Sequence, residues 1–325
     1  MREYKKKVLS LQEQVNLLKS RGVNISDEDR VIRHLSNISY YRLSAYMLPF
    51  KIIQDNKTTN NFKKQTSWDD IYELYVFDRK LRLLIFNAIE KIEVAVRSRV
   101  VLSLSLKYGS HWHERADIFK NTKKTSCDMF KQIGKRISEE RKNINKEVYV
   151  EHYWNTYNKP KTPPSWMIVE LLYFNQLSKI SKYLKYRSDR TLISDYFHLP
   201  SNIFSSWLHA LNYVRNLCAH HARLWNRDLK ITPDEFTLKK KYIKTDIKWL
   251  SSINGIRKNK IYYTLCIIKY LLQTINKNSS FGTKLYELII SYSEKHKLIN
   301  IVSHMGFPPN WESDFLCDCI CIYDF

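Results

Sequence analysis

The sequence predicts an all-α protein, and three observations support this prediction. Only 6 glycines and 8 prolines occur in 325 residues, and these are the residues that most strongly interrupt regular structure. Apolar residues recur every three to four positions in most segments, which is the period of an amphipathic helix. Hydrophobic residues make up 44% of the chain, enough to form the core of one large domain or two small ones.

Helical periodicity and capping signals place the elements in order along the chain. Gly22 ends the first helix, and Ser26-Asp27 precedes the second as a cap. The polar stretch 51–66 is expected to be a loop, and 107–165 to be less regular apart from one exposed helix. The expected helices cover 8–21, 27–37, 38–46, 68–106, 126–141, 166–186, 207–227, 261–275 and 280–295.

These elements are expected to form one folded unit with three parts. Residues 1–66 form an N-terminal helical arm, 67–278 the helical core, and 279–325 a C-terminal helix and tail that pack on this core. In the tail, a Pro-rich turn is expected to place Phe307 and Trp311 against the core.

The charge of the chain points to a polyanionic partner. Lys and Arg number 54 against 32 Asp and Glu, a net charge of +22, which favours nucleic acid over a membrane surface. A biased codon composition could explain many of the lysines, but not the stripe of Arg, His and Asn described below. No apolar run approaches the ~18 residues of a membrane span, and polar residues interrupt any signal core near the N-terminus. A cytoplasmic protein is therefore expected.

The cysteines and a histidine cluster are not expected to bind metal. Cys218 and Cys266 lie in apolar helical patterns and are expected to be buried free thiols. The spacing Cys317-x-Cys319-x-Cys321 is not a usual zinc motif. His111-x-His113-Glu114 resembles a ligand set but has no distant partner in the sequence. No metal and no cofactor are expected.

The candidate site lies in the stretch from Trp207 to Arg227, WLHALNYVRNLCAHHARLWNR. If this stretch is one helix, a turn of about 100° per residue places its polar side chains in one stripe. His221 falls among the apolar residues, so we expect His220 to be the functional histidine and His221 a packed one. The stripe, with Arg215 at its edge, comprises His209, Asn212, Asn216, His220, Arg223 and Arg227.

Two other segments could support this site. Glu90, Glu93 and Arg97 share one face of the expected helix 68–106. They are either a solvated ladder of ion pairs or a group that faces His220 and orients it. Tyr41 and Arg42 either stack on RNA bases or pack as ordinary helix residues.

The spacing Arg215-Asn216-x-x-x-His220 resembles the R-x4-6-H motif of the HEPN ribonuclease superfamily. Five stretches, found in order between residues 38 and 311, resemble the Abi-like (AbiD/AbiF) family of abortive-infection proteins: ISYYRLSAYMLPF, VFDRKLRLLIFNAIEKIEVAVRSR, PPSWMIVELLYFNQLSK, YVRNLCAHHARLWNR and MGFPPNW. The tail after Trp311 departs from the endings expected for this family.

The resemblance implies a HEPN-type helical bundle with helical N-terminal and C-terminal extensions. It also implies a metal-independent endoribonuclease that acts in phage defence as a toxin, restrained by a partner such as a small structured RNA. HEPN sites are usually shared between two subunits, which implies a homodimer. By the motif, Arg215 and His220 take the catalytic roles and Asn216 a supporting one, and we expect Asn212, Arg223, Arg227, Glu93, Arg97, Tyr41 and Arg42 to bind RNA or support the site.

The chemistry of these residues suits attack of an RNA 2′-hydroxyl on the adjacent phosphate. A histidine can move the proton near neutral pH, and the planar guanidinium of Arg215 can stabilise charge on phosphoryl oxygens. The stripe contains no carboxylate cluster, so Mg²⁺ is not required. A two-fold dimer would bring two Arg–His pairs together. Two alternatives remain open: a non-catalytic RNA-binding module, and a helical protein-interaction subunit of a defence complex.

The charge predicts that RNA co-purifies with the protein at low salt and is released as the salt concentration rises. Lys and Arg side chains displace condensed counterions from phosphates, so the affinity should fall steeply with salt. The absorbance spectrum of the purified protein and filter binding over a salt series measure this. An affinity that is absent or independent of salt would contradict the prediction.

Overall fold

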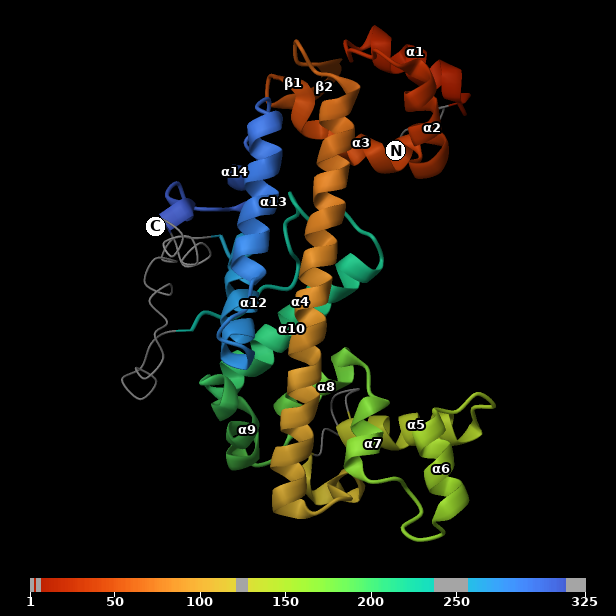
Figure 1. Cartoon of the computed structure of the whole chain (residues 1–325), viewed down its shortest axis with the longest axis vertical. Helices are drawn as coiled ribbons and strands as arrows, with labels where there is room; N and C mark the ends of the chain where they lie inside the picture. Colours follow the sequence, from red (N-terminus) through yellow and green to blue (C-terminus); the bar gives the residue numbers. More distant parts are fainter. Residues whose placement is uncertain (1–2, 4–6, 121–127, 237–256, 314–325) are drawn as a thin grey trace.

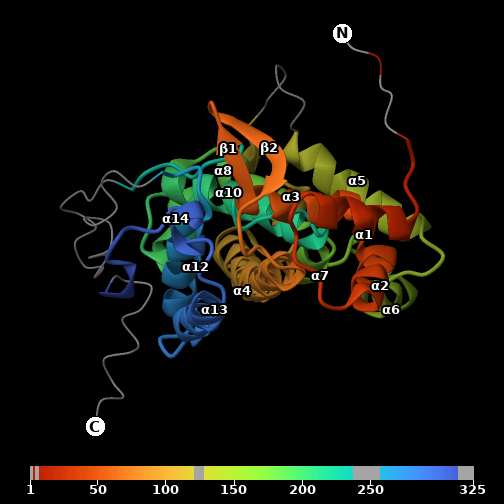
Figure 2. The ribbon, with the colours of Figure 1, turned by 90° about the horizontal axis from the view of Figure 1, so that it is seen from above.

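The computed structural model describes residues 3, 7–120, 128–236 and 257–313, and it confirms the prediction of an all-α fold. One long helix, α4 (Trp68–Tyr108), runs most of the length of the molecule, and most of the other helices pack along it (Figure 1). Figure 2 looks down this helix and shows the remaining elements around it. None of the described helices is long and apolar enough to cross a bilayer.

Helix α4 has clear local reasons for its start and end. Ser67 and Asp70 form a capping box at its first turn, and Gly109, at φ 85°, ends it. Its 41 residues span roughly 60 Å at 1.5 Å per residue. Its buried side chains recur at helical spacing and face neighbours along its whole length, so α4 supplies one wall of the core in every part of the fold.

The N-terminal part contains three helices and a β-hairpin. The helices are α1 (Leu11–Ser20), α2 (Glu28–Ile38) and α3 (Tyr40–Met47), and the strands are β1 (Lys51–Gln54) and β2 (Lys57–Phe62). The prediction of a loop over 51–66 is therefore wrong. Asp55 and Asn56 adopt φ of 50° and 58°, the backbone that a two-residue hairpin turn requires. The Asp55-Asn56 pair is a turn signal that the sequence contained. The strands on either side of it are rich in polar residues, so the segment resembled a loop.

The region expected to be less regular contains more helix than predicted. The described helices are α5 (Met129–Lys142), α6 (Val148–Thr156), α7 (Ser165–Glu170), α8 (Phe174–Tyr183) and α9 (Arg187–Ser194), with short 3₁₀ turns at Trp112–Glu114, Ala116–Ile118 and Asp195–Phe197. The single helix expected over 166–186 is broken between α7 and α8. At this break, backbone carbonyl groups bond to the guanidinium of Arg97 instead of continuing the helical ladder.

Helix α10 (Ser201–Ala219) crosses α4 and packs against α8 and α4 (Figure 1). The prediction that it continues to Arg227 is wrong. His220 is the capping residue and His221 adopts φ 55°, in the left-handed region. The chain then leaves the helix direction, although no Gly or Pro marks the change. The division into a polar stripe and an apolar side, which assumed a continuous helix, therefore does not apply beyond Ala219.

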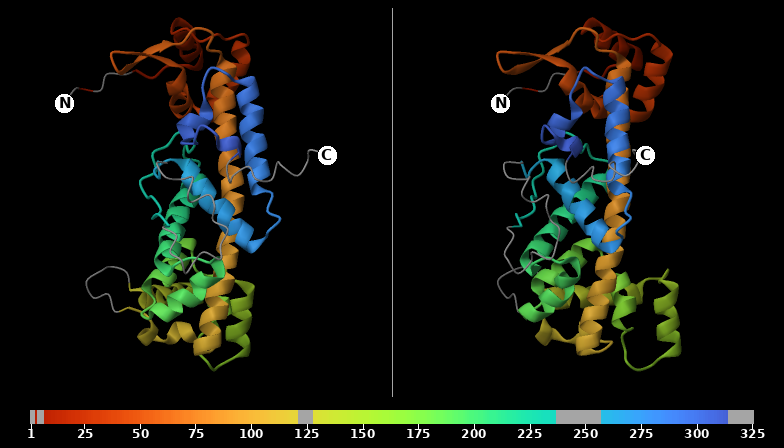
Figure 3. Two further views of the ribbon diagram at one scale, coloured as in Figure 1. Left: turned by 90° about the vertical axis from the view of Figure 1, so that its left-hand side faces the viewer. Right: turned by 60° about the vertical axis from the view of Figure 1, so that its left-hand side comes forward.

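The helices after residue 257 pack against α4 and against one another. Helix α12 (Ile261–Ile275) is buried, α13 (Phe281–Lys295) lies alongside α4, and α14 (Ile301–Met305) follows, with a 3₁₀ turn at Trp311–Ser313 (Figure 3). Packing of Phe307 and Trp311 is confirmed, because both are buried with ring centroids 5.3 Å apart.

Two of the six cysteines lie in the described part of the chain. Cys218 and Cys266 are buried and neither is in a disulfide bond, as expected. Burial raises the pKa of the Cys218 thiol to about 12, so this thiol stays protonated and unreactive. Cys127, Cys317, Cys319 and Cys321 lie outside the described residues.

The segment after α10 is fixed by one buried carboxylate on α4. Asp78 accepts hydrogen bonds from the backbone amides of Leu224 and Trp225, at 3.1 and 2.8 Å. It also accepts one from the Tyr46 hydroxyl at 2.6 Å and forms an ion pair with Arg82. Both Asp78 and Arg82 are buried. A buried charge is tolerated only when it is paired and fully hydrogen bonded, as here.

We expect Asp78→Ala to lower the free energy of unfolding by about 3–5 kcal/mol, because it leaves Arg82 buried without a counter-charge and two amides without an acceptor. Tyr46→Phe is the matched control, since it removes one hydrogen bond from the same group and should cost about 1 kcal/mol. Urea denaturation of both variants measures this. Equal small losses would show that Asp78 does not fix the segment.

Candidate functional site

A polar cleft of about 450 Å³ lies where α10 meets α4, α5 and the turn between α7 and α8. It brings together five residues that the sequence proposed, from two elements far apart in the chain: Glu93 and Arg97 of α4, and Asn212, Arg215 and Asn216 of α10. Its other lining residues are Arg136, Glu147, Tyr149, Glu170, Leu171, Leu172, Tyr173, Phe174 and Asn175.

The α10 wall of the cleft follows from helical spacing. Asn212 and Asn216 are four residues apart and so lie on one face, one turn from each other. Arg215 is partly buried, and its guanidinium carbon lies 5.4 Å from the centre of the Phe86 ring on α4. This cation–π contact directs the Arg215 side chain across the α4–α10 interface. The wall therefore offers one cation and two side-chain amides.

Arg97 fixes the shape of the opposite wall. Its guanidinium pairs with Glu93 at 2.5 Å and donates to the backbone carbonyls of Leu172, at 2.7 Å, and of Val169 and Glu170. The expected ion pair is thus confirmed, but it is not a solvated ladder: the side chains of Arg97 and Glu93 are only 12% and 15% exposed. Arg97 therefore holds the α7–α8 turn in place through its carbonyl groups.

Two acids near this wall are exposed. Glu170 has a side chain that is 55% exposed, with its carboxylate 4.0 Å from Arg97. Glu90 is exposed and does not line the cleft. Glu147 and Arg136 reach the cleft from the α5–α6 region, and no local motif in the sequence marked either of them. Arg136 donates to the Leu171 carbonyl at 2.9 Å, so it holds the same turn as Arg97.

His220 lies one turn beyond Asn216, at the C-terminal end of α10. Its backbone amide donates to the Asn216 carbonyl at 2.9 Å. Its side chain is exposed, as predicted, but His220 is not one of the residues that line the cleft. Arg215, Asn216 and His220 therefore follow one another along the end of α10, with His220 open to solvent.

His221 is not the packed residue that the sequence predicted, because it is exposed. Its left-handed backbone ends the helix, and its carbonyl accepts a hydrogen bond from Arg42 at 2.8 Å. The prediction failed because it assumed a helix through this residue. A substitution at His221 is consequently not expected to open a cavity.

The remaining predicted residues belong to the contact between α3 and the segment after α10. Arg223 donates to the Ala45 carbonyl at 2.9 Å, and Arg227 to the Arg223 carbonyl at 3.1 Å. Together with Arg42, these arginines hold the backbone, and none of them lines the cleft. Tyr41, by contrast, is 90% exposed, so its ring is available to stack on a base.

The histidine cluster of residues 111–114 has a structural role. His111 bonds to the Thr162 carbonyl, while His113 and Glu114 bond to the Thr162 hydroxyl. Burial lowers the pKa of His113 to about 4, which keeps its ring neutral. Within the described part of the chain, no group of three His, Cys, Asp or Glu residues is placed to hold a metal ion.

Comparisons with known proteins give one match. A family model described as Abi-like protein matches residues 33–226, well over half of the chain. This span includes α3, the whole of α4 and the α10 segment with Arg215, Asn216 and His220. No curated protein and no solved structure matches the chain.

We expect Arg97→Ala to destabilise the protein by about 1–3 kcal/mol, because it leaves carbonyls of the α7–α8 turn and the Glu93 carboxylate without a donor. Glu90→Ala is the control on the same helix and should change stability by less than about 0.5 kcal/mol, since Glu90 is exposed. Chemical denaturation and amide hydrogen exchange at residues 169–173 measure both effects. Unchanged exchange in this turn would contradict the role given to Arg97.

Proposed function

This chain belongs to the Abi-like protein family, and from that premise we propose that it is a metal-independent endoribonuclease of the HEPN type. The family supports a role in abortive-infection defence. The observation that supports nuclease chemistry is the order Arg215, Asn216, His220 along the end of α10, with the first two in a polar cleft. A cation, an amide and an exposed imidazole can stabilise the charge on a phosphate, position it and accept a proton from the attacking hydroxyl.

The proposed reaction is an internal transfer within the RNA strand. The 2′-oxygen attacks the adjacent phosphorus while His220 takes the 2′-hydroxyl proton. The bond from phosphorus to the 5′-oxygen breaks, and that oxygen is protonated as it leaves. The products are a 2′,3′-cyclic phosphate and a 5′-hydroxyl. Arg215 stabilises the charge that grows on the non-bridging phosphoryl oxygens, and Asn216 holds the phosphate.

A dimer and a bound RNA complete the proposal. The motif gives one Arg–His pair per chain, and a two-fold axis near the end of α10 would place a second pair beside the first. The second histidine would then protonate the leaving 5′-oxygen. A structured RNA, attracted by the net charge of +22, would restrain this activity in the cytoplasm until infection.

We expect His220→Ala to reduce RNA cleavage by about 10²–10⁴-fold, the usual contribution of general acid–base catalysis. His221→Ala is the matched control: its side chain is also exposed, so both variants should keep their stability within about 0.5 kcal/mol. Cleavage of a labelled RNA is measured with and without EDTA, together with the chemistry of the product ends. Cleavage should survive EDTA and leave a cyclic or 3′-phosphate.

Three outcomes would contradict this assignment. Loss of activity in His221→Ala alone would move the catalytic role to His221, which the R-x4-6-H spacing also permits. Products with 3′-hydroxyl ends that form only with metal would exclude the proposed mechanism. RNA that binds but is never cut, by the wild-type protein as by His220→Ala, would favour the non-catalytic RNA-binding module.

A further inference from the structure

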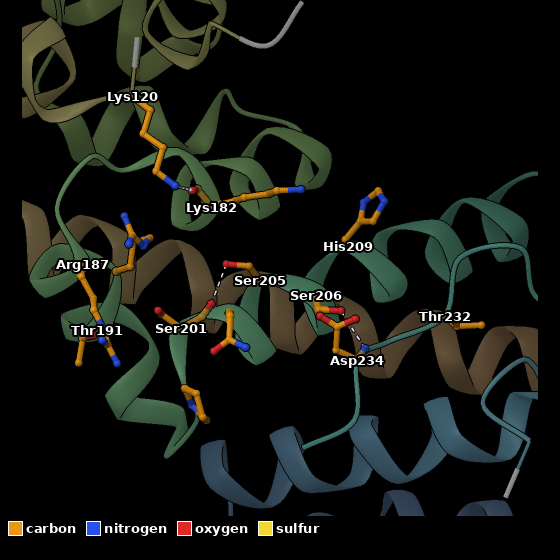
Figure 4. Close-up of a pocket in the computed structure, with 13 residues that line it drawn as sticks. Lys120, Lys182, Arg187, Thr191, Ser201, Ser205, Ser206, His209, Thr232 and Asp234 are labelled. Carbon is orange, nitrogen blue, oxygen red and sulfur yellow. Dashed lines mark hydrogen bonds between the residues drawn. The ribbon is translucent and has the colours of Figure 1, made fainter. Parts of the chain in front are cut away.

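We propose that a second pocket, at the N-terminal end of α10, binds a backbone phosphate of the RNA strand whose scissile bond lies near Arg215; the choice of RNA rests on the proposed function. The pocket has a volume of about 660 Å³ and lies between α8, α9, α10 and the segment at 232–234 (Figure 4). Its lining residues are Lys120, Lys182, Arg187, Arg190, Thr191, Pro200, Ser201, Asn202, Ser205, Ser206, His209, Thr232 and Asp234.

The charge of this pocket is strongly positive. Four cations line it, from α8, α9 and the chain before α5, and Asp234 is the one carboxylate among the lining residues. A concave surface that is lined by positive charges raises the local concentration of anions. The cations are Lys120, Lys182, Arg187 and Arg190.

Two of these cations hold the backbone, and two are available to a ligand. Arg190 donates to the Leu184 and Lys185 carbonyls at 2.6 and 3.0 Å, and Lys120 donates to the Lys182 carbonyl at 2.9 Å. Lys182 and Arg187 are exposed. Neither forms an ion pair with a described residue, and the Lys182 ammonium lies 5.8 Å from the centre of the Tyr183 ring. Figure 4 shows Lys120 and Lys182 on one side of the pocket, with the serines of α10 across from them.

The α10 wall adds groups that suit a phosphate. Pro200 gives the helix no side-chain cap, so its first backbone amides are open to an anion. Ser206 accepts from the Asp234 amide at 2.8 Å, which fixes its side chain at the wall. The Ser205 hydroxyl donates to the Ser201 carbonyl at 2.8 Å, so it holds the helix and does not donate to the anion. Burial, with Lys182 and Lys179 nearby, lowers the pKa of His209, so its imidazole favours the neutral form and adds no positive charge to the wall.

The composition of the lining favours a phosphate over a nucleotide base. Small-molecule sites are usually dominated by apolar and aromatic side chains, and RNA bases bind by stacking on aromatic rings. Here the lining consists of cations, hydroxyls and the Asn202 amide, with Pro200, the His209 imidazole and the Asp234 carboxylate as the exceptions. No Phe, Tyr or Trp lines the pocket.

The pocket and the Arg215 cleft lie at two ends of the same helix pair. Along α10, Ser205 and His209 line the pocket, and Asn212 and Asn216 line the cleft, at spacings of three or four residues. Helix α8 runs the opposite way, since its start lines the cleft and its Lys182 lines the pocket. The Ser181 and Ser205 hydroxyls lie 3.3 Å apart and join the two helices at the pocket end.

The distance between the two sites fits a short piece of RNA. From Ser205 to Asn216 is roughly 16 Å along the helix at 1.5 Å per residue. At about 3.4 Å per nucleotide, the axial rise of a fully stacked strand, this is at most about five nucleotides, and fewer where the strand is extended. One strand could therefore lie along α10 with one phosphate in the pocket and another at Arg215.

The test compares the wild-type protein with the double variant Lys182→Ala/Arg187→Ala. The ligand is a 12-nucleotide single-stranded 2′-O-methyl RNA with a 5′-hydroxyl, which lacks the attacking hydroxyl and stays intact. Affinity is measured by fluorescence anisotropy over a salt series. We expect binding at least tenfold weaker and a salt slope reduced by about 1.4, because each lost phosphate contact on a single strand lowers the slope by about 0.7.

The matched control is Lys284→Ala/Lys297→Ala, which removes the same net charge. Both lysines are exposed, on or just after α13, which packs on α4, α12 and α14. This control should change affinity less than twofold. Equal losses in the two double variants would mean that binding depends on overall charge, and an unchanged pocket variant would mean that the pocket binds no RNA; either result overturns the proposal. A defect that appears only with 5′-phosphorylated RNA would also overturn it, since the pocket would then bind a terminal phosphate.

The failure of this inference can be told apart from failure of the proposed nuclease function. The binding assay needs no cleavage, so a pocket-dependent affinity in a protein that cuts no RNA would leave the inference standing and remove the nuclease. If unmodified RNA is cleaved and Lys182→Ala/Arg187→Ala leaves the KM unchanged, the nuclease function stands and the phosphate pocket is removed.

Discussion

The position of the candidate site depends on the buried carboxylate of Asp78. This one group connects α4 to α3 through Tyr46 and to the segment after α10 through the amides of Leu224 and Trp225. Because it binds the chain just beyond α10, it determines where that helix ends and hence where His220 leaves it. A buried carboxylate without these partners would be strongly unfavourable, so α3, α4 and the end of α10 must assemble together.

Arg97 provides a second fixed point on the other side of the cleft. It joins α4 to the carbonyls of the α7–α8 turn, while Asp78 joins α4 to backbone amides after α10. Both groups bind backbone atoms of segments that have left a helix, and those atoms would otherwise lack partners. The arginines at positions 42, 223 and 227 act in the same way. Much of the positive charge near the site therefore stabilises the fold, and the net charge alone does not locate an RNA-binding surface.

The sequence predicted what is periodic and missed what depends on distant contacts. The all-α class, α4 and the packing of Phe307 and Trp311 follow from local patterns, and so does the pairing of Glu93 with Arg97. The end of α10 at Ala219 does not, because Leu224 and Trp225 continue the helical spacing of apolar residues. Their amides instead bond to Asp78, 146 and 147 positions earlier in the chain, and Arg42 and Arg223 also hold this backbone. His221 was misplaced for this reason. The basic pocket had no sequence signal, since its cations come from separate elements.

Helix α10 connects the two sites that the proposed RNA strand would contact, the basic pocket and the Arg215 cleft. The pocket at the start of α10 offers cations and hydroxyls, which bind phosphate in any sequence, whereas the cleft near its end offers Arg215 and Asn216, with His220 one turn further. The helix fixes both the separation and the direction of these groups, because each residue adds about 1.5 Å and turns the chain by about 100°. A one-residue insertion within α10 would rotate the two sets of side chains onto different faces. The function proposed for the end of α10 thus depends on the unbroken helix between Ser201 and Ala219 as much as on the residues that contact RNA.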